Sequence, residues 1–426
     1  MVSNEGSAEE KVLRTVESMR EEILSFLGDL ISKRSIPGKE LEIQQFISAK
    51  LGEIGLEVDK WEPSWEELKK HPGYVSVEMG YEGRPNVVGI CRGVGGGRSL
   101  LFNGHVDIIP ADPANWSTDP WASQIREGQL FGRGASDMKS GLAAMTMAVK
   151  AILNCGLRPK GDIFLEYVMD EEYSGNGTLG CIQRGYRADA GISCEAGDLE
   201  IQPATTGSMW FEIEVEGKSA SMSRRWEAVS AIEKGYLLYQ AVSDFEQHRI
   251  GTITHPLYPD PRGSLACFVG QLISGTYPSA PPAKCILRGR MGALPSEDAQ
   301  EAQRQFIEYL KAVAQKDPWL KDHPPRIQFT GYYAEPAEIS PQHPVCLTLA
   351  DVFKRVTGKE PVIKGHDGAA DTRFLIKYGN IPTVIFGPGT IAQMHADNEW
   401  VRTEDVMTVT KVLAVTILNW CGYTEE

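Results

Sequence analysis

The segment LLFNGHVDIIP, residues 100–110, places an imidazole and a carboxylate where an apolar strand ends. Residues two positions apart on a strand point to the same side, so we expect His105 and Asp107 to face one way. An Asp in that position can accept the second ring N–H of a metal-binding His and hold the imidazole in place. By itself the triplet is weak evidence, because two polar residues also commonly end a surface strand.

Further acids and a second His follow apolar segments that lie far apart in the sequence. Asp137 lies in GRGASDMKSG, Glu171 and Glu172 end IFLEYVMDEE, Glu195 ends AGISCEAG, and His395 lies in GPGTIAQMHADNEWV. In open α/β sheets, functional sites form at the carboxyl ends of strands. Two imidazoles and several carboxylates, without a thiolate, suit zinc or a similar divalent ion, and one carboxylate can bridge two ions. Each residue alone is more often solvated or structural; their joint occurrence favours a two-metal hydrolytic site.

The elements that must position these residues alternate between strands and helices, which predicts an α/β fold with a mixed, mostly parallel sheet and helices on both faces. The pattern changes near Gly207, where a β-α-β-β-α-β order indicates an inserted ferredoxin-like unit. We therefore expect a discontinuous catalytic domain, residues 1–206 and 334–426, and an inserted domain, residues 207–333. The expected helices include 11–34, 39–55, 226–249, 297–316, 344–357, 370–378 and 403–421.

The composition limits the partners. The 426 residues carry a formal charge of −14, which disfavours nucleic acid or an anionic membrane surface as a partner. The polar N-terminal stretch has no apolar core of a signal peptide, and no stretch approaches the length of a membrane span. Eight cysteines without a CxxC pair indicate reduced thiols in the cytoplasm.

Five segments resemble, in order, the acetylornithine deacetylase, succinyl-diaminopimelate desuccinylase and aminoacylase family of metallohydrolases: GHVDIIP, W...DPW...LFGRGASDMKSG, MDEEYSGNGT, AGISCEAG and GPGTIAQMHADNEWV. The resemblance covers about residues 15–420. YEGRPNVVGICRGVGGGRSLLFNGHVD is most similar to a deacylase branch that includes an N-formyl-aminomethylpyrimidine deformylase. The resemblance implies a zinc-exopeptidase-like catalytic domain and an inserted lid and dimerisation domain.

The resemblance also implies the ligands. His105 and Glu195 would hold one zinc, Glu172 and His395 the other, and Asp137 would bridge the two and precede a cis peptide bond. Zinc is favoured by the resemblance, although cobalt or manganese could occupy the same ligands.

Two acids carry catalytic roles in this resemblance. Asp107 would orient His105. Glu171 would be the general base, which takes a proton from metal-bound water and passes it to the leaving amine.

The expected substrate contacts come from the C-terminal part of the chain. Arg373, in DGAADTRFL, resembles the family's carboxylate-binding Arg; alternatively, it is a surface helix residue paired with Asp371. Gly387 and Gly389 would let the backbone approach the substrate closely.

One departure affects both the substrate site and the dimer. Ser221 stands where the family normally has a His that reaches into the partner's active site, so the substitution alters substrate use or weakens catalysis. We favour an active enzyme that removes an acetyl, formyl or succinyl-like group from a small amine or amino acid. The resemblance implies a homodimer through the inserted domain. The alternatives are a dipeptidase or carboxypeptidase with the same site, or a small-molecule-binding or metal-binding protein with little activity.

Overall fold

The computed structural model describes residues 7–425 of the chain, which form two compact units. Within the described residues, unit 1 comprises residues 7–204, Glu338–His366 and residues 371–425. Unit 2 comprises Thr205–Ala337 and Asp367–Ala370. Short strands, β9 (Ala204–Thr205) and β14 (Ala337–Glu338), lie where the chain passes from one unit to the other.

A six-stranded sheet with the order β1-β2-β7-β3-β8-β15 forms the centre of unit 1. Its strands are β1 (Glu57–Trp61), β2 (Asn86–Cys91), β7 (Ile163–Val168), β3 (Leu100–His105), β8 (Ala190–Ser193) and β15 (Thr383–Ile385). Strands β7, β3, β8 and β15 run parallel to one another, whereas β1 and β2 pair antiparallel. The carboxyl ends of the four parallel strands therefore share one edge, which we call the catalytic edge.

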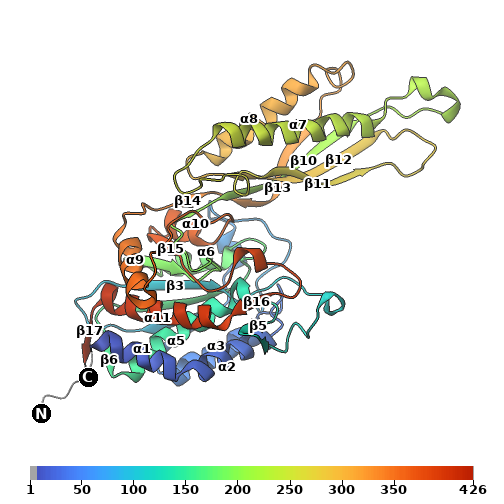
Figure 1. Cartoon of the computed structure of the whole chain (residues 1–426). Helices are drawn as coiled ribbons and strands as arrows, with labels where there is room; N and C mark the ends of the chain where they lie inside the picture. Colours follow the sequence, from blue (N-terminus) through green and yellow to red (C-terminus); the bar gives the residue numbers. More distant parts are fainter. Residues whose placement is uncertain (1–6, 426) are drawn as a thin grey trace, which may run out of the picture. The chain divides into compact units, whose positions relative to one another are not determined.

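Helices cover both faces of this sheet, as predicted (Figure 1). One group lies on the side of α5 and α11, and α6 and α10 lie on the opposite side. The helices of unit 1 are α1 (Ala8–Ser18), α2 (Arg20–Ser32), α3 (Leu41–Ile54), α4 (Trp65–Leu68), α5 (Ser140–Asn154), α6 (Asn176–Arg184), α9 (Pro344–Thr357), α10 (Thr372–Lys377) and α11 (Thr403–Cys421). Helix α5 is buried almost all round, as its Ala-, Met- and Leu-rich sequence requires.

Two smaller sheets complete unit 1. One has the order β16-β5-β4 and contains β16 (Trp400–Arg402), β5 (Gln129–Phe131) and β4 (Gln124–Arg126). The other pairs β17 (Tyr423–Glu425) with β6 (Leu157–Pro159) near the end of α11.

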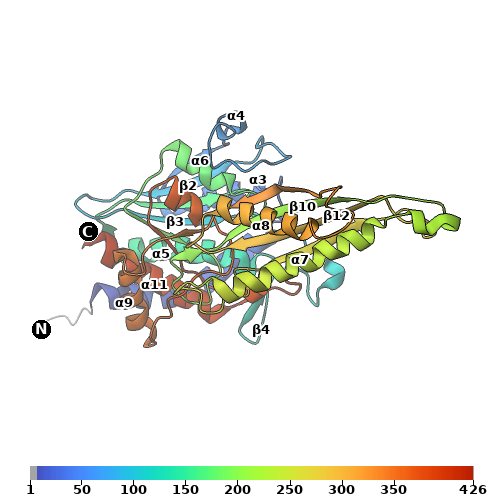
Figure 2. The same cartoon turned by 90° about the horizontal axis from the view of Figure 1, so that it is seen from above.

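Unit 2 has the predicted β-α-β-β-α-β order. Its elements are β10 (Gly207–Glu216), α7 (Ala231–Thr252), β11 (Cys267–Ser274), β12 (Lys284–Ala293), α8 (Ala299–Ala314) and β13 (Arg326–Ala334). The antiparallel sheet has the order β11-β12-β10-β13, and α7 and α8 lie side by side over one of its faces (Figure 2). Packed aromatic rings, such as Phe211 and Phe306 with centroids 4.7 Å apart, fill the space between the sheet and these helices.

Two expected helices differ in their bounds. The predicted helix 11–34 is two helices, because α1 ends at Ser18, whose hydroxyl donates to the carbonyl of Thr15 at 2.8 Å. The predicted helix 226–249 begins only at Ala231, where the Ser230 hydroxyl accepts the N–H of Glu233 as an N-cap. None of the helices in residues 7–425 has the length and apolar character that crossing a membrane requires.

Candidate metal centre

Two sets of potential metal ligands lie at the catalytic edge of unit 1. In the first set, Nε2 of His105 lies 3.0 Å from Oδ1 of Asp137 and 3.4 Å from Oε1 of Glu195. His105 is the last residue of β3, and Glu195 lies two residues beyond the end of β8. The ligand atoms of this buried set all lie within 4.8 Å of one another.

The second set contains the same aspartate. Nε2 of His395 lies 2.9 Å from Oε2 of Glu172 and 3.2 Å from Oδ2 of Asp137. Asp137 therefore presents Oδ1 to one imidazole and Oδ2 to the other, the arrangement that a carboxylate bridging two cations requires. The structure thus brings together the five residues that the sequence predicted as ligands.

Asp107 lies beside this centre but makes a different contact from the one predicted. Its backbone carbonyl, not its carboxylate, is the nearer acceptor for Nδ1 of His105, at 2.9 Å against 3.7 Å. A carbonyl can only accept a hydrogen bond, so Nδ1 carries the proton and Nε2 is left to face the acids. The Asp107 carboxylate instead accepts the backbone N–H groups of Glu171 and Glu172, at 3.2 and 3.1 Å. The prediction missed this because the chain leaves the strand at His105.

A buried glutamate holds the turn that carries Asp137. Oε1 of Glu399 accepts the N–H groups of Ser136 and Asp137 at 2.7 and 3.0 Å. Its Oε2 accepts Gly134 N–H and Nη1 of Arg133, both at 2.9 Å. The peptide bond that follows Asp137 is cis, as the family resemblance implied.

A buried ion-pair network holds the turn that carries Glu171 and Glu172. Asp170 precedes them with a φ of +70°, in the left-handed region that non-glycine residues seldom adopt. Nη2 of Arg84 donates to Oδ1 of Asp170 at 2.8 Å and to Oε1 of Glu40 at 2.5 Å. The Tyr81 hydroxyl donates to the other oxygen of Asp170 at 3.1 Å. We call Arg84, Glu40 and Asp170 the Arg84 network.

The electrostatics of the centre favour positive charge. Burial, together with the charge of neighbouring acids such as Asp137, raises the pKa of Glu195 to about 8. Hydrogen bonds to Asp137 and Glu172 raise the pKa of His395 to about 11. Oε2 of Glu195 is buried and has no hydrogen-bond partner within residues 7–425. Crowded acids with one unsatisfied oxygen, together with nitrogen and oxygen donors, fit two divalent cations.

Glu171 belongs to neither ligand set. Its backbone is fixed by Asp107, and burial, followed by the charges of nearby acids such as Asp371 and Glu195, raises the pKa of its carboxyl well above the ordinary value. A carboxyl with a raised pKa beside a cluster of ligands is suited to accept and then return a proton.

Comparison with known proteins identifies the family to which this fold belongs. The model of peptidase family M20/M25/M40 matches residues 101–419. The chain belongs to this family. As a member of a peptidase family, it is a hydrolase that acts on amide bonds.

Relatives with assigned activities cover most of the chain. An N-formyl-4-amino-5-aminomethyl-2-methylpyrimidine deformylase from Bacillus subtilis is 30% identical, with 97% of this chain and 98% of the relative covered. A succinyl-diaminopimelate desuccinylase from Gluconacetobacter diazotrophicus is 28% identical over 76% of this chain and 82% of its own. The fold is similar to that of the dipeptidase Dug1p from Saccharomyces cerevisiae, with a TM-score of 0.75, 14% identity, and 97% and 98% of the two chains covered.

Arg373, the expected substrate-binding residue, is only 3% exposed and does not lie on a surface helix face. Its Nη2 donates to the backbone carbonyl of Ser174 at 2.7 Å, and its Nη1 lies 3.9 Å from Oδ1 of Asp371. These contacts tie α10 to the segment that follows Glu172.

The two glycines that were expected to approach the substrate lie against the ligand segments. A β-carbon on Gly387 would lie 2.2 Å from the carbonyl oxygen of Glu195. A β-carbon on Gly389, whose φ is +87°, would lie 2.4 Å from the Ser136 hydroxyl. Both positions therefore require glycine because of the ligand segments themselves.

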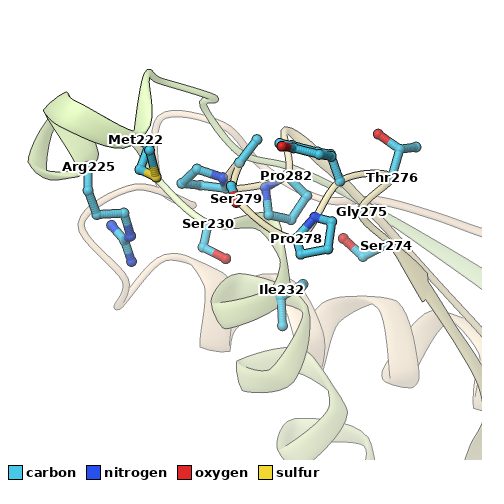
Figure 3. Close-up of a pocket in the computed structure, with 13 residues that line it drawn as sticks. Met222, Arg225, Ser230, Ile232, Ser274, Gly275, Thr276, Pro278, Ser279 and Pro282 are labelled. Carbon is cyan, nitrogen blue, oxygen red and sulfur yellow. The ribbon is translucent and has the colours of Figure 1, made fainter.

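Ser221, the departure from the family pattern, is an exposed residue of unit 2 whose hydroxyl lies 3.0 Å from that of Ser223. The next residue, Met222, lines a hollow of about 720 Å³ (Figure 3). Arg225, Ser230 and Ile232 line it from the same part of the chain, and the end of β11 with the loop that follows it, residues 274–282, lines the opposite side.

Sequence reasoning missed Glu399 and the Arg84 network. Glu399 lies four residues beyond His395, inside a segment that the sequence had marked, so its acidic side chain in NEW was an available signal. Glu40 and Arg84 lie in segments without a recognised motif, and nothing in their spacing indicated that they meet.

Proposed function

We propose that the chain is a metal-dependent N-deacylase that removes a formyl group from the primary amine of a small molecule. The observation that carries the proposal is the pair of ligand sets that share Asp137, with Glu171 fixed beside them. The choice of a formyl group is supported by the deformylase relatives from Bacillus subtilis and Halalkalibacterium halodurans, which each match 97% of the chain. Acetyl and succinyl groups are the next candidates, because a desuccinylase matches 76% of it.

Five residues would hold the two cations. We assign one cation to His105 and Glu195 and one to Glu172 and His395, with Asp137 shared between them. The two cations would polarise the amide carbonyl and stabilise negative charge on its oxygen.

Glu171 takes a proton from the attacking water and delivers it to the amide nitrogen, so that the C–N bond breaks to give the free amine and the carboxylate of the acyl group. Asp107 keeps Glu171 in reach by accepting its backbone N–H.

Amine release from N-formyl, N-acetyl and N-succinyl compounds and from simple dipeptides tests the proposal, with zinc, cobalt or manganese added to the full chain. Glu171→Ala should lower kcat at least ~100-fold, the range of a general base, and keep the same metal content. Glu67→Ala, a change on the exposed helix α4, is the matched control and should leave the rate unchanged.

Three results would distinguish the outcomes. Turnover of the N-formyl compounds, lost in Glu171→Ala, supports the deformylase. Faster turnover of dipeptides than of the N-acyl compounds would indicate that the chain is a dipeptidase and not a deacylase. A metal-loaded chain without turnover of any amide would overturn the enzymatic role.

We further propose zinc as the metal, a reducing cytoplasmic location and a homodimer formed through unit 2. All eight cysteines are buried and free, which supports a reducing compartment.

For the dimer, the supporting observation is an exposed apolar stripe on α7. It contains Ile232, Tyr236 and Tyr239, which are 44%, 55% and 43% exposed. Light scattering should give twice the chain mass, and Tyr236→Glu should give the single mass; a monomeric wild type would remove this part of the proposal.

A further inference from the structure

Helices α7 and α8 leave one face of the unit 2 sheet open (Figure 1). An unusual row of side chains lies on that open face. On β12, Leu287 and Met291 point into the core, so the intervening Arg288 and Arg290 point to the open face. Arg290 lies directly opposite Trp210 of β10 on one side and Phe268 of β11 on the other. Trp210 and Phe268 are 54% and 48% exposed.

A third aromatic residue extends this row. The ring of Tyr332, on β13, lies 6.0 Å from the ring of Trp210. We call Phe268, Arg290, Trp210 and Tyr332 the arginine–aromatic row. It crosses all four strands of the sheet, so neighbouring strands hold its members at fixed spacing.

Among residues 7–425, Arg290 has no carboxylate partner, whereas its neighbour Arg288 has one. Nε of Arg288 donates to Oε2 of Glu212 at 2.8 Å, and Gln328 donates to the other oxygen of that carboxylate. Nε of Arg290 is buried and has no hydrogen-bond partner in the part of the chain that the structure describes. Leaving a buried charged donor unpaired is costly, and the Arg290 side chain as a whole is only half-buried, so the rest of its guanidinium can receive an acceptor from outside the chain.

Three members of the row, Phe268, Arg290 and Trp210, line a hollow of about 680 Å³ in unit 2. The paired Arg288 and Glu212, together with Gln328, also line it, and the rest of the lining is Phe211, Gln271, Thr330 and three glycines, Gly270, Gly289 and Gly331. One of them, Gly331, makes room for the row: its φ is +83°, and a β-carbon there would lie 3.0 Å from the Trp210 ring. A concave surface with flat apolar walls and one unpaired cation is suited to a small ligand that is both planar and anionic.

We propose that this hollow binds an aromatic monocarboxylate, with its carboxylate on Arg290 and its ring against Trp210. A guanidinium matches a carboxylate in a two-pronged hydrogen bond, and the aromatic side chains beside it provide faces for a ring. The proposal goes beyond the deacylase function, because it uses residues of unit 2 alone and none of the metal ligands.

Benzoate binding to the full, metal-loaded chain tests the proposal. Calorimetry and tryptophan fluorescence measure the affinity. Arg290→Met should weaken binding at least ~10-fold, because it removes a charge-assisted pair and keeps the side-chain length. Arg288→Met, which removes a guanidinium already paired with Glu212, is the matched control and should stay within about twofold. Cyclohexanecarboxylate, which keeps the charge but lacks the π face, should bind at least ~3-fold more weakly than benzoate.

Two further measurements locate the ligand. Arg290→Lys keeps the charge but not the fork, so it should recover part of the affinity lost in Arg290→Met. Chelating the metal should leave benzoate binding unchanged. The proposal is overturned if benzoate does not bind, if Arg288→Met weakens binding as much as Arg290→Met, or if binding disappears with the metal. Equal melting temperatures of the two methionine variants would show that the loss is not one of folding.

Discussion

Two arginines at opposite ends of β2 make the same kind of contact in opposite surroundings. Arg84 precedes the strand at the catalytic edge and joins Glu40 and Asp170, with all three side chains at most 3% exposed. Arg92 follows the strand at the other edge and joins Glu57 and Asp162, at 3.0 and 3.2 Å, but is itself 58% exposed. The catalytic edge thus removes its supporting charges from water, whereas the opposite edge leaves them solvated.

This difference indicates that the strongest ion pairs of unit 1 lie at the catalytic edge. Desolvated charges interact strongly with one another and cannot be left unpaired without a large cost. Solvated pairs are screened and contribute little to stability. The segments that carry the acids and imidazoles of the candidate metal centre are therefore held by strong interactions between buried charges. Four substitutions test this contrast between the two edges.

The largest effect is expected for Arg84→Met. It leaves two buried carboxylates without their cation, so the free energy of unfolding should fall by about 3–5 kcal/mol, as found for broken buried pairs. Chemical denaturation measures this loss. Adding Glu40→Gln to the variant should return part of the stability, because one uncompensated charge is removed. A loss below ~1 kcal/mol would show that the buried network is no stronger than a surface pair.

The second effect concerns Glu399, which accepts the N–H groups around Asp137. Glu399→Ala should weaken metal binding about 10–100-fold, the usual cost of removing a residue that orients a ligand, and added metal should restore activity. Glu297→Ala is the matched control, since Glu297 also accepts an arginine, Arg249, and a backbone N–H, but in unit 2. It should lower stability and leave metal affinity unchanged; equal loss of affinity in both variants would contradict an orienting role for Glu399.

The third effect appears on changing pH. Glu166 is fully buried below the catalytic edge, one of its oxygens has no hydrogen-bond partner within residues 7–425, and burial raises its pKa to about 8. A raised pKa in the folded state means that this carboxyl stabilises the protein fully below about pH 4.5 and that the contribution is lost as the pH rises through about 8. Glu166→Gln removes this titration, so its stability relative to wild type should rise between pH 5 and pH 9. Denaturation curves at both values check this, and parallel pH profiles for the two proteins would refute it.

The smallest effect is expected for Arg92→Met, the exposed counterpart of Arg84→Met. The free energy of unfolding should change by less than ~1 kcal/mol, and the change should shrink further in high salt. A loss comparable to that of Arg84→Met would erase the distinction between the two ends of β2.

The sequence was sufficient for those parts of the molecule that follow from local pattern. The β-α-β-β-α-β order of unit 2 and the bounds of α9 and α11 follow from hydrophobic periodicity and from Pro or Gly at helix ends. The five expected ligands come together because each follows an apolar strand or a glycine-rich turn, and parallel strands deliver their carboxyl ends to one edge.

The residues that hold the ligand segments, Glu399 and the Arg84 network, could not be predicted in this way. Glu40 and Arg84 are separated by 44 residues, and Glu399 and Asp137 by 262. No periodicity relates such pairs, and an isolated acid in a sequence is usually a solvated one. Arg373 and Asp107 show the same limit on a finer scale: the sequence marked both residues, but their partners are backbone groups that only the folded chain brings near.

Gly387 limits which amino-acid substitutions this enzyme can tolerate. Its α-carbon lies so close to the carbonyl of Glu195 that any side chain, even a methyl group, would have to displace the backbone that carries this expected metal ligand. Backbone cannot swing aside as a flexible side chain can, so the mutational paths open to this chain exclude that position. New specificity, in nature or in the laboratory, therefore has to come from residues that can vary without moving the ligands, while this segment stays fixed through every such change.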